Sequence, residues 1–345
     1  MKQDRMRLIE GLDEAKGIGI ILVVFGHALT WELAGTSVFL IYLRYTVYLL
    51  HMPLFFMVSG YLFEWKKEKY QKRGFCHFML EKARILMLPY IIFSAIAWIV
   101  TWMGFQFPFG KALLEGAGYS MKSPAGFLFS LLTYICPVDN HLWFSYVLFL
   151  VFLLAFGLMG KPKKIVLPAA YAGYALSFLI PLPELIQKLM RYFFLFQAGT
   201  VLYRKERWLD NRRARLIVGP AFAVGFLFFC IFHALNWGEP QILSEPVAEI
   251  AGCSLILYIM ARLKKGKGMK LLKETGRMSY QIYLLHHPFV VPGLLILLKG
   301  RMPVALLLPT VTVLGILIPV AVYRWVFERW SSLNIVCFGG RSRDQ

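Results

Sequence analysis

Residues 141–159 read HLWFSYVLFLVFLLAFGLM, a run without a single Lys, Arg, Asp or Glu. A helix rises 1.5 Å per residue, so about 20 such residues cross a hydrocarbon core of ~30 Å. The run therefore predicts a membrane-spanning helix, and nine further apolar runs predict others. The ten predicted spans cover residues 17–35, 44–63, 84–104, 141–159, 165–181, 186–203, 214–233, 247–262, 278–298 and 304–326.

The composition agrees with a chain that lies mostly in lipid. Of its 345 residues, 58% are hydrophobic and 17% are charged, whereas about a quarter are charged in a typical soluble domain. The predicted fold class is an all-α, polytopic membrane helix bundle with about ten transmembrane helices. Residues 125–136 (AGFLFSLLTYIC) are apolar but too few to span, which predicts a short interfacial or re-entrant helix.

The basic residues give the predicted bundle an orientation. Of the 38 Lys and Arg residues, 31 lie in six segments that alternate with pairs of spans. Lys and Arg collect in cytoplasmic loops, so the pattern predicts a bacterial inner-membrane protein with both termini in the cytoplasm. The short basic clusters also argue against nucleic-acid binding, although the net charge is +19. The six segments are 1–16, 64–84, 160–164, 203–215, 262–277 and 323–345.

The domain organisation is simple. No internal repeat or long linker is visible, which predicts one integral-membrane domain over residues 1–330 and a short cytoplasmic tail over 331–345. The first apolar run follows basic residues but lacks an evident small-residue cleavage site, so we interpret it as a retained helix. The five cysteines stand singly, and the sequence predicts neither a disulfide framework nor a metal site.

Polar residues at membrane depth are costly and are therefore candidates for function. In the first span, DEAKGIGIILVVFGHA, Lys16 and His27 are eleven residues apart. At ~100° per residue the two side chains share one helix face, with His27 ~16 Å deeper than Lys16. Asp13, three residues before Lys16, is placed for a local ion pair. A buried neutral imidazole at position 27 suits a general base.

Two further spans carry histidines at a comparable predicted depth. His51 lies in YLLHMPLFFMVSGYLF, ~18 Å from the cytoplasmic end of the second span, and His286 lies in SYQIYLLHHPFV, ~13 Å into the ninth. The competing interpretation is that membrane histidines only hydrogen-bond across helices. No H-E-x-x-H motif and no facing carboxylate accompanies them in the sequence, so no metal site is predicted.

Two more segments carry candidate binding residues. Lys82 and Arg84 in LEKARILMLPY lie at the cytoplasmic entry of the third span, where cations can hold the phosphates of a nucleotide-containing donor. They also obey the positive-inside rule, which is the simpler explanation. His141 and Trp143 in NHLWFSYVLF offer a polar group beside an aromatic surface, which suits a sugar ring or an interfacial aromatic belt.

Taken in order, these segments resemble the acyltransferase-3 family, in particular its branch related to fucose 4-O-acetylase. The resemblance covers nearly the whole chain. The family's first-helix pattern of a basic residue, ten further residues and a histidine is met by Lys16 and His27. One departure is in the third helix, where the family often has two basic residues three apart. Here Ile85 follows Lys82 at that spacing, and Arg84 is the substitute.

The resemblance implies a membrane O-acetyltransferase that moves an acetyl group from cytoplasmic acetyl-CoA to a hydroxyl of an extracytoplasmic or lipid-linked glycan. It implies no tightly bound cofactor, and partners limited to acetyl-CoA, the glycan and membrane lipids. His27 would act as a base or carry the acetyl group. A multi-pass transporter is the main alternative, and a non-catalytic ligand-binding module is another. The implied donor-binding residues are Lys16, Lys82 and Arg84, and the implied acceptor-channel residues are His51, Ser59, His141, Trp143 and His286.

Overall fold

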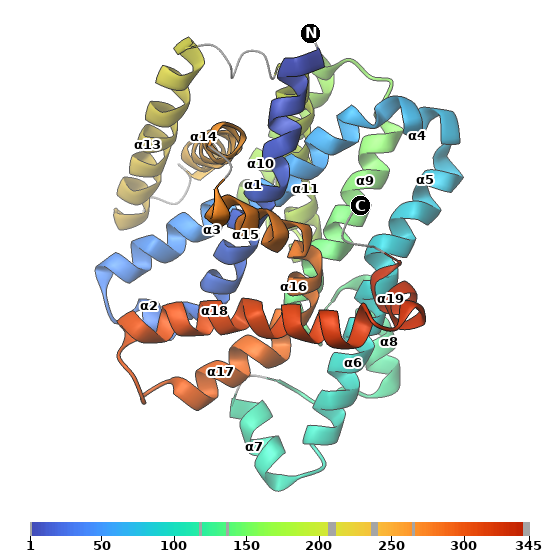
Figure 1. Ribbon diagram of the computed structural model, residues 1–345, viewed down its shortest axis with the longest axis vertical. Helices are drawn as coiled ribbons and strands as arrows, with labels where there is room; N and C mark the ends of the chain where they lie inside the picture. The colour runs from blue at the N-terminus through green and yellow to red at the C-terminus, as the bar shows by residue number, and fades with distance from the viewer. Residues whose placement is uncertain are drawn as a thin grey trace.

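The computed structural model describes residues 2–116, 119–135, 138–205, 212–235, 241–263 and 266–340. Helices dominate these residues, and within the described ranges no strand is formed beyond an isolated bridge between Lys299 and Met302. The all-α prediction is confirmed. The chain forms one closely packed bundle in which helices distant in sequence lie against each other (Figure 1).

The first half of the chain begins at one end of the bundle and reaches the opposite end at α7 (Figure 1). Its elements are α1 (Lys2–Ala28), α2 (Trp31–Ala34), α3 (Val38–Trp65), α4 (Lys67–Arg73), α5 (Phe75–Lys82), the π-helical turn η1 (Ala83–Met87), α6 (Leu88–Gly104), α7 (Pro108–Gly116), α8 (Pro124–Thr133), the 3₁₀ turn η2 (Asn140–Leu142) and α9 (Trp143–Gly157).

The second half packs around α1 and α3 and ends with α18 lying across the others in the view of Figure 1. Its elements are α10 (Lys163–Leu179), α11 (Glu184–Arg204), α13 (Arg212–Ala234), α14 (Gln241–Arg262), α15 (Lys267–Arg277), α16 (Ser279–Leu285), the π-helical turn η3 (His286–Val290), α17 (Val291–Leu298), α18 (Val304–Val322), the π-helical turn η4 (Tyr323–Phe327) and α19 (Ser331–Phe338).

Each of the ten predicted spans coincides with helical structure. Among the described residues, six helical stretches are long and apolar enough to cross a membrane, so the chain is a membrane helix bundle. That all ten segments cross remains a prediction. The short apolar segment after the third span forms α8, as predicted. The six stretches are Val38–Trp65, Phe75–Gly104, Asn140–Gly157, Ile242–Arg262, Ser279–Leu298 and Val304–Phe327.

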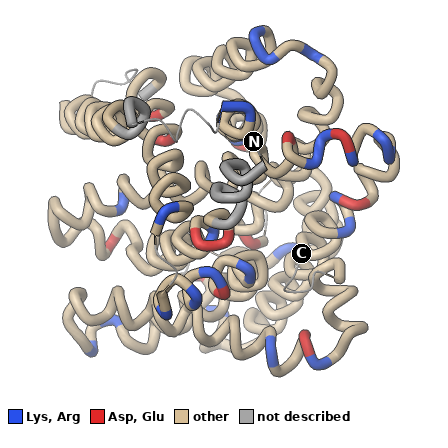
Figure 2. The backbone as a smooth tube through the Cα atoms, turned by 45° about the horizontal axis from the view of Figure 1, so that its top comes forward, with Lys and Arg blue, Asp and Glu red and all other residues tan. Residues whose placement is uncertain are grey.

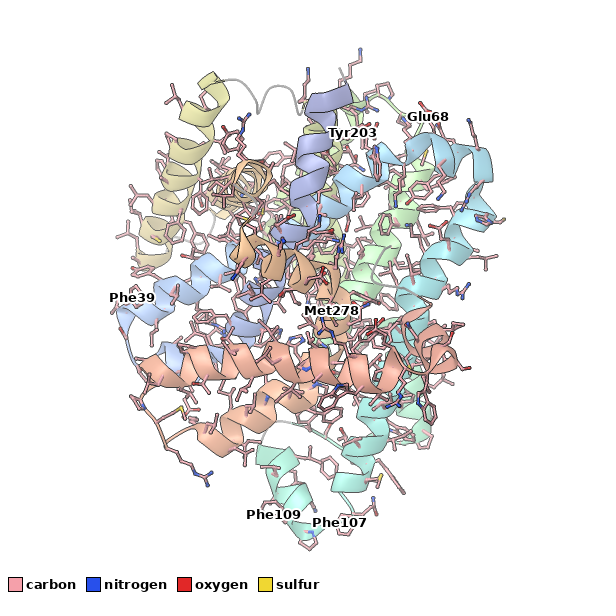
Figure 3. The ribbon with its side chains drawn as sticks, in the orientation of Figure 1. Phe39, Glu68, Phe107, Phe109, Tyr203 and Met278 are labelled. Atoms are coloured by element: carbon pink, nitrogen blue, oxygen red, sulfur yellow. The ribbon has the colours of Figure 1, made fainter. Side chains whose placement is uncertain are left out.

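The charged residues are unevenly distributed over the bundle. Figure 2 shows long uncharged stretches of backbone, with Lys, Arg, Asp and Glu concentrated on a few segments such as α4 and α5. Glu68 and Tyr203, from two predicted cytoplasmic segments, lie toward the same end, and Phe107 and Phe109 lie at the opposite end (Figure 3). The cytoplasmic placement of the first two segments remains a prediction.

Small residues allow the central helices to approach closely. A Cβ atom at Gly60 of α3 would lie 1.9 Å from the Phe196 carbonyl oxygen, and one at Gly199 of α11 would lie 2.0 Å from the Met57 carbonyl oxygen. The backbones of α3 and α11 therefore touch, as is common where membrane helices meet through small residues. Gly199 therefore has a packing role.

The segment predicted as a tail is structured as far as residue 340. Helix α19 packs against α6 and η4, and the Phe338 ring lies 5.6 Å from Phe93 and 5.0 Å from Phe327 between ring centroids. Phe338 is fully buried. The helix therefore contributes to the bundle, and it brings Gly339 against the Arg84 backbone and Gly340 against the Arg84 guanidinium.

Candidate active site

Four imidazole rings from three parts of the chain meet inside the bundle. His27 belongs to the last turn of α1, His141 to η2, and His286 and His287 to η3. The His27 ring centroid lies 5.2 Å from that of His286, 5.1 Å from that of His287 and 6.4 Å from that of His141. We call these four residues the imidazole cluster. The predicted face of α1 that carries His27 thus points into the protein.

Local sequence explains why two adjacent histidines both reach this cluster. Neighbouring residues on a helix point about 100° apart. Pro288, however, disfavours helical backbone for the residue before it, and His287 is extended, with φ −129° and ψ 149°. The break turns both rings toward His141, whose centroid lies 5.3 Å from His286 and 4.9 Å from His287.

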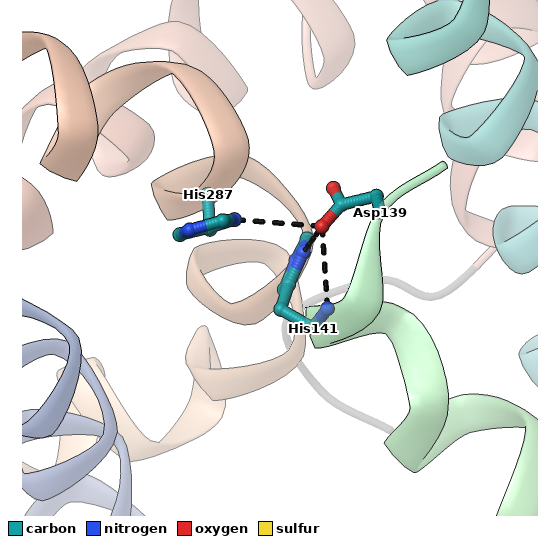
Figure 4. A group of neighbouring side chains, drawn as sticks. All are labelled: Asp139, His141 and His287. Carbon is teal, nitrogen blue, oxygen red and sulfur yellow. Dashed lines mark hydrogen bonds and ion pairs between the residues drawn. The ribbon is translucent and has the colours of Figure 1, made fainter. Parts of the chain in front are cut away.

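A buried carboxylate lies beside the cluster. The Asp139 Oδ1 atom is 2.6 Å from His141 Nδ1 and accepts a 3.2 Å hydrogen bond from the His141 backbone N–H (Figure 4). His287 Nδ1 lies 3.4 Å from the same oxygen. Asp139 is 3% exposed. Two histidines and one carboxylate therefore offer ligand atoms that all lie within 4.8 Å of one another.

Backbone carbonyls hold two of the rings in position. His141 Nε2 lies 3.1 Å from the Tyr283 carbonyl oxygen, and the Tyr283 hydroxyl donates back to the His141 carbonyl at 2.6 Å. His286 Nδ1 lies 3.0 Å from the Ile282 carbonyl and 2.8 Å from the Tyr283 carbonyl. A carbonyl only accepts, so His286 Nδ1, which faces two carbonyl oxygens, carries a proton. His141 faces an acceptor on both ring nitrogens, the Tyr283 carbonyl at Nε2 and the Asp139 carboxylate at Nδ1.

Two adjoining cavities approach the cluster. The inner cavity, of about 170 Å³, is lined by residues that include Lys16, Ser59, Arg277 and Tyr283. The larger one, of about 980 Å³, is lined by basic residues of α4, α5, η1 and the turn before α4, and we call it the basic vestibule. Both are lined by Ser59, Leu62 and Leu148. The basic side chains of the vestibule are Lys66, Lys69, Arg73, His77, Lys82 and Arg84.

The predicted donor-binding residues lie along these two cavities. Lys16 lines the inner cavity and forms an ion pair with Asp13 at 2.7 Å, as the i, i+3 spacing predicted. Lys82 and Arg84 line the vestibule, and Lys82 is buried, with its Nζ atom 3.1 Å from the Tyr70 hydroxyl. The structure thus brings the three predicted cations to two adjoining cavities.

The predicted acceptor residues divide into two groups. His141 and His286 belong to the imidazole cluster, and Ser59 lies where the two cavities adjoin. The His51 ring instead packs against Tyr48 of its own helix, at 4.7 Å, with Nδ1 2.8 Å from the Val47 carbonyl.

Trp143 belongs to an aromatic group rather than to the cluster. Its ring lies parallel to that of Phe56 with centroids 6.2 Å apart, and 4.9 Å from that of Tyr192. The Lys188 ammonium lies 4.7 Å from the Trp143 ring centroid, a cation–π distance.

Sequence reasoning missed Asp139, His287 and Tyr283 as members of the site. Asp139 stands two residues before His141 in PVDNH, and His287 stands directly before Pro288. Two local signals could have found them. An Asp directly before a short helix often caps it, which applies to Asp139. A residue before Pro tends to leave the helical conformation, which applies to His287. No local signal marks Tyr283, because its role depends on the hydrogen bond to His141, 142 residues away in the sequence.

Comparison with known families agrees with this architecture. A family model described as an acyltransferase domain matches residues 9–324, nearly the whole chain. The chain therefore belongs to the acyltransferase-3 family, and its class is that of a membrane acyltransferase.

Two similar proteins are nodulation proteins. The chain is 28% identical over 233 residues to the nodulation protein NolL of Mesorhizobium japonicum, covering 66% of this chain and 56% of that protein. It is 29% identical over 241 residues to NolL of Sinorhizobium fredii, covering 66% and 57% respectively. The chain thus matches a little over half the length of these relatives. No solved structure matches it.

Proposed function

We propose that this protein is an inner-membrane O-acetyltransferase, with both termini in the cytoplasm, that moves acetyl groups from acetyl-CoA to a hydroxyl of an extracytoplasmic or lipid-linked glycan. The observation that carries the proposal is the basic vestibule, which adjoins an inner cavity bounded by Tyr283, a contact of His141 in the imidazole cluster. Family membership supports acyl transfer. The names of the two related proteins refer to nodulation and do not name a substrate.

The vestibule suits the nucleotide end of coenzyme A. That end carries several phosphates, and Lys and Arg bind phosphates through charge-assisted hydrogen bonds. Lys69, Arg73 and Arg84 are exposed side chains that line the vestibule. The uncharged pantetheine arm would then enter the narrower inner cavity, past Ser59. The thioester would then point toward Tyr283, the residue of the inner cavity that contacts His141 of the imidazole cluster.

The chemistry requires one proton transfer and one bond exchange. His27 takes the proton of the acceptor hydroxyl, the resulting oxygen nucleophile attacks the thioester carbonyl, and the C–S bond breaks. The thiolate of coenzyme A then receives the proton from His27, so that ester and free thiol leave. The route through an acetyl-histidine uses the same residue as nucleophile. The rings of His286 and His287, 5.2 and 5.1 Å away, limit how the His27 ring can turn.

The acceptor side is proposed on the aromatic residues of α9 and its neighbours. Trp143 and Tyr192 lie next to each other, with ring centroids 4.9 Å apart, beside the Lys188 ammonium. Aromatic faces cover the apolar faces of sugar rings, and a cation hydrogen-bonds to hydroxyl groups. His51 is then a neighbour of the acceptor path through α3 and does not contact the reacting atoms.

The test is acetylation of cell-surface glycans in cells that make the wild type or His27→Ala at matched protein levels. Mass spectrometry before and after mild base treatment counts acetyl esters. Esters that appear with the wild type and are lost with His27→Ala support the proposal. The control is Lys111→Ala, an exposed change on α7 at a residue that lines neither cavity. Glycan export without consumption of acetyl-CoA would instead favour a transporter.

A further inference from the structure

His141 faces a hydrogen-bond acceptor at each of its two ring nitrogens. His141 Nε2 faces the Tyr283 carbonyl oxygen at 3.1 Å, and His141 Nδ1 faces the carboxylate oxygen Oδ1 of Asp139 at 2.6 Å. Both oxygens only accept hydrogen bonds, whereas a neutral imidazole has a single N–H to donate. One proton therefore serves only one of the two contacts. A metal cation between His141 Nδ1 and Asp139 would leave the ring proton on Nε2 for the Tyr283 carbonyl.

Two further atoms of this site also lack hydrogen-bond partners within the described part of the chain. Asp139 Oδ2 and His287 Nδ1 are both buried, and neither makes a hydrogen bond to the described residues, although His287 Nδ1 lies 3.4 Å from Asp139 Oδ1. Leaving a buried polar atom without a partner costs roughly 1–3 kcal/mol. A proton between His141 and Asp139 Oδ1 does nothing for these two atoms, whereas a cation bound between the three side chains would use both.

We propose that Asp139, His141 and His287 bind one divalent transition-metal ion of the zinc class. Two imidazoles and one carboxylate are a ligand set that zinc accepts, and three protein ligands leave a position open for substrate. The backbone carbonyl on His141 Nε2 fits, because metal-bound histidines donate their other N–H to such an acceptor. The facing carboxylate, which the sequence did not reveal, is supplied by Asp139.

A metal held by these three residues would lie next to the proposed base. The His27 ring centroid is 5.1 Å from that of His287, and the adjacent ring of His286 has a buried Nε2 that makes no hydrogen bond to the described residues. A hydroxyl bound to zinc loses its proton more easily than a free one. Resting on the proposed function, the inference is that the metal would bind the acceptor hydroxyl beside His27.

The test measures metal binding directly on the full-length chain, purified in detergent through a tag that contains no histidine run. Elemental analysis counts zinc per chain. After a chelator removes the metal, titration with Co²⁺ is followed by its visible absorption, which is intense in tetrahedral sites. We expect one metal ion per chain in the wild type and in His77→Gln. In Asp139→Asn and His287→Gln we expect Co²⁺ to bind at least ~100-fold more weakly.

Absence of metal from the wild type together with no spectral change on Co²⁺ addition would overturn the site, as would equal Co²⁺ affinity in Asp139→Asn. If the variants do not fold, the metal content and the Co²⁺ titration of the wild type still test the proposal. A ligand that binds only the native state raises the unfolding temperature, so no shift with saturating Zn²⁺ contradicts the proposal. Metal-free protein that acetylates at the full rate rejects the metal's catalytic part and leaves the acetyltransferase standing. Metal that binds to the wild type, together with no acetyl transfer, keeps the metal site and rejects the proposed acetyltransferase function.

Discussion

The guanidinium of Arg44 donates a 3.1 Å hydrogen bond from Nη1 to the carbonyl of Gly26, the residue directly before His27. The same nitrogen donates to the Leu29 carbonyl. Helix α1 ends at Ala28, and the last carbonyls of a helix have no partner within it. Arg44 of α3 therefore caps the end of α1 that carries His27 and fixes the position of that turn.

The first prediction is that Arg44→Met lowers both stability and acetyl transfer. Arg44 is buried, its guanidinium carbon lies 4.5 Å from the Trp31 ring centroid and 4.3 Å from that of Tyr48, and its loss leaves buried carbonyls unpaired. We expect a cost of about 1–3 kcal/mol in the free energy of unfolding. Thermal unfolding in detergent measures it. Arg301→Met is the matched control, because Arg301 is exposed and its guanidinium donates to the Leu297 carbonyl of its own preceding turn. Equal stability of the two variants would contradict the capping role.

The second prediction concerns the basic vestibule. Arg84 is exposed and lines it, and a hydrogen bond to a charged group contributes about 1.5–3 kcal/mol. Arg84→Ala should therefore raise the KM for acetyl-CoA by roughly 10- to 100-fold, with little change in kcat. Steady-state kinetics at varied donor concentration checks this. Lys111→Ala, an exposed change on α7 at the other end of the bundle, should leave the KM unchanged. A fall in kcat at constant KM would exclude Arg84 from donor binding.

The third prediction tests the contact between α3 and α11. Gly60→Ala places a methyl group 1.9 Å from the Phe196 carbonyl oxygen, so the two backbones must separate. We expect a loss of about 1–3 kcal/mol in stability, measured by denaturation in detergent. Gly219→Ala is the control, since nothing lies within 4 Å of a Cβ there and Ala favours helix over Gly. If both variants unfold at the same temperature, the helices do not touch as described.

The fourth prediction is a pH dependence at the cytoplasmic end of α1. Burial alone would raise the pKa of Asp13, but the charges and hydrogen bonds of Lys16 and Arg277 hold that pKa below its ordinary value of 3.8. A lowered carboxyl pKa stabilises the fold above the ordinary value, and this stabilisation is lost as the pH falls through and below it. The contribution should be about 1 kcal/mol or less, because the Asp13 side chain is 28% exposed.

The measurement is the stability difference between the wild type and Asp13→Asn over pH. We expect the difference to be full near pH 6 and to narrow as the pH falls from about 4 toward 3. Asp13→Glu, which keeps the charge, should retain more of the stability than Asp13→Asn. A gap that stays constant down to pH 3 would show that the ion pairs with Lys16 and Arg277 contribute nothing.

The sequence by itself determined the membrane class and the position of the helices, and it singled out His27 as the candidate catalytic residue. Each of these depends on properties of a single segment: hydropathy over about 20 residues, charge between the segments, and the angle between Lys16 and His27 along one helix. The short helix α8 followed for the same reason, since twelve apolar residues cannot span.

Only the tertiary structure decided which histidines meet. Sequence gives depth along a helix, and on depth alone His51 was as good a partner for His27 as His286. Which side chains become neighbours depends on how the helices pack. Packing is set by contacts between segments far apart in the chain, such as that of Gly60 with Phe196. Asp139 reaches His287 for the same reason: a loop before α9 packs against a helix broken at a proline, and no local pattern in either segment specifies the other.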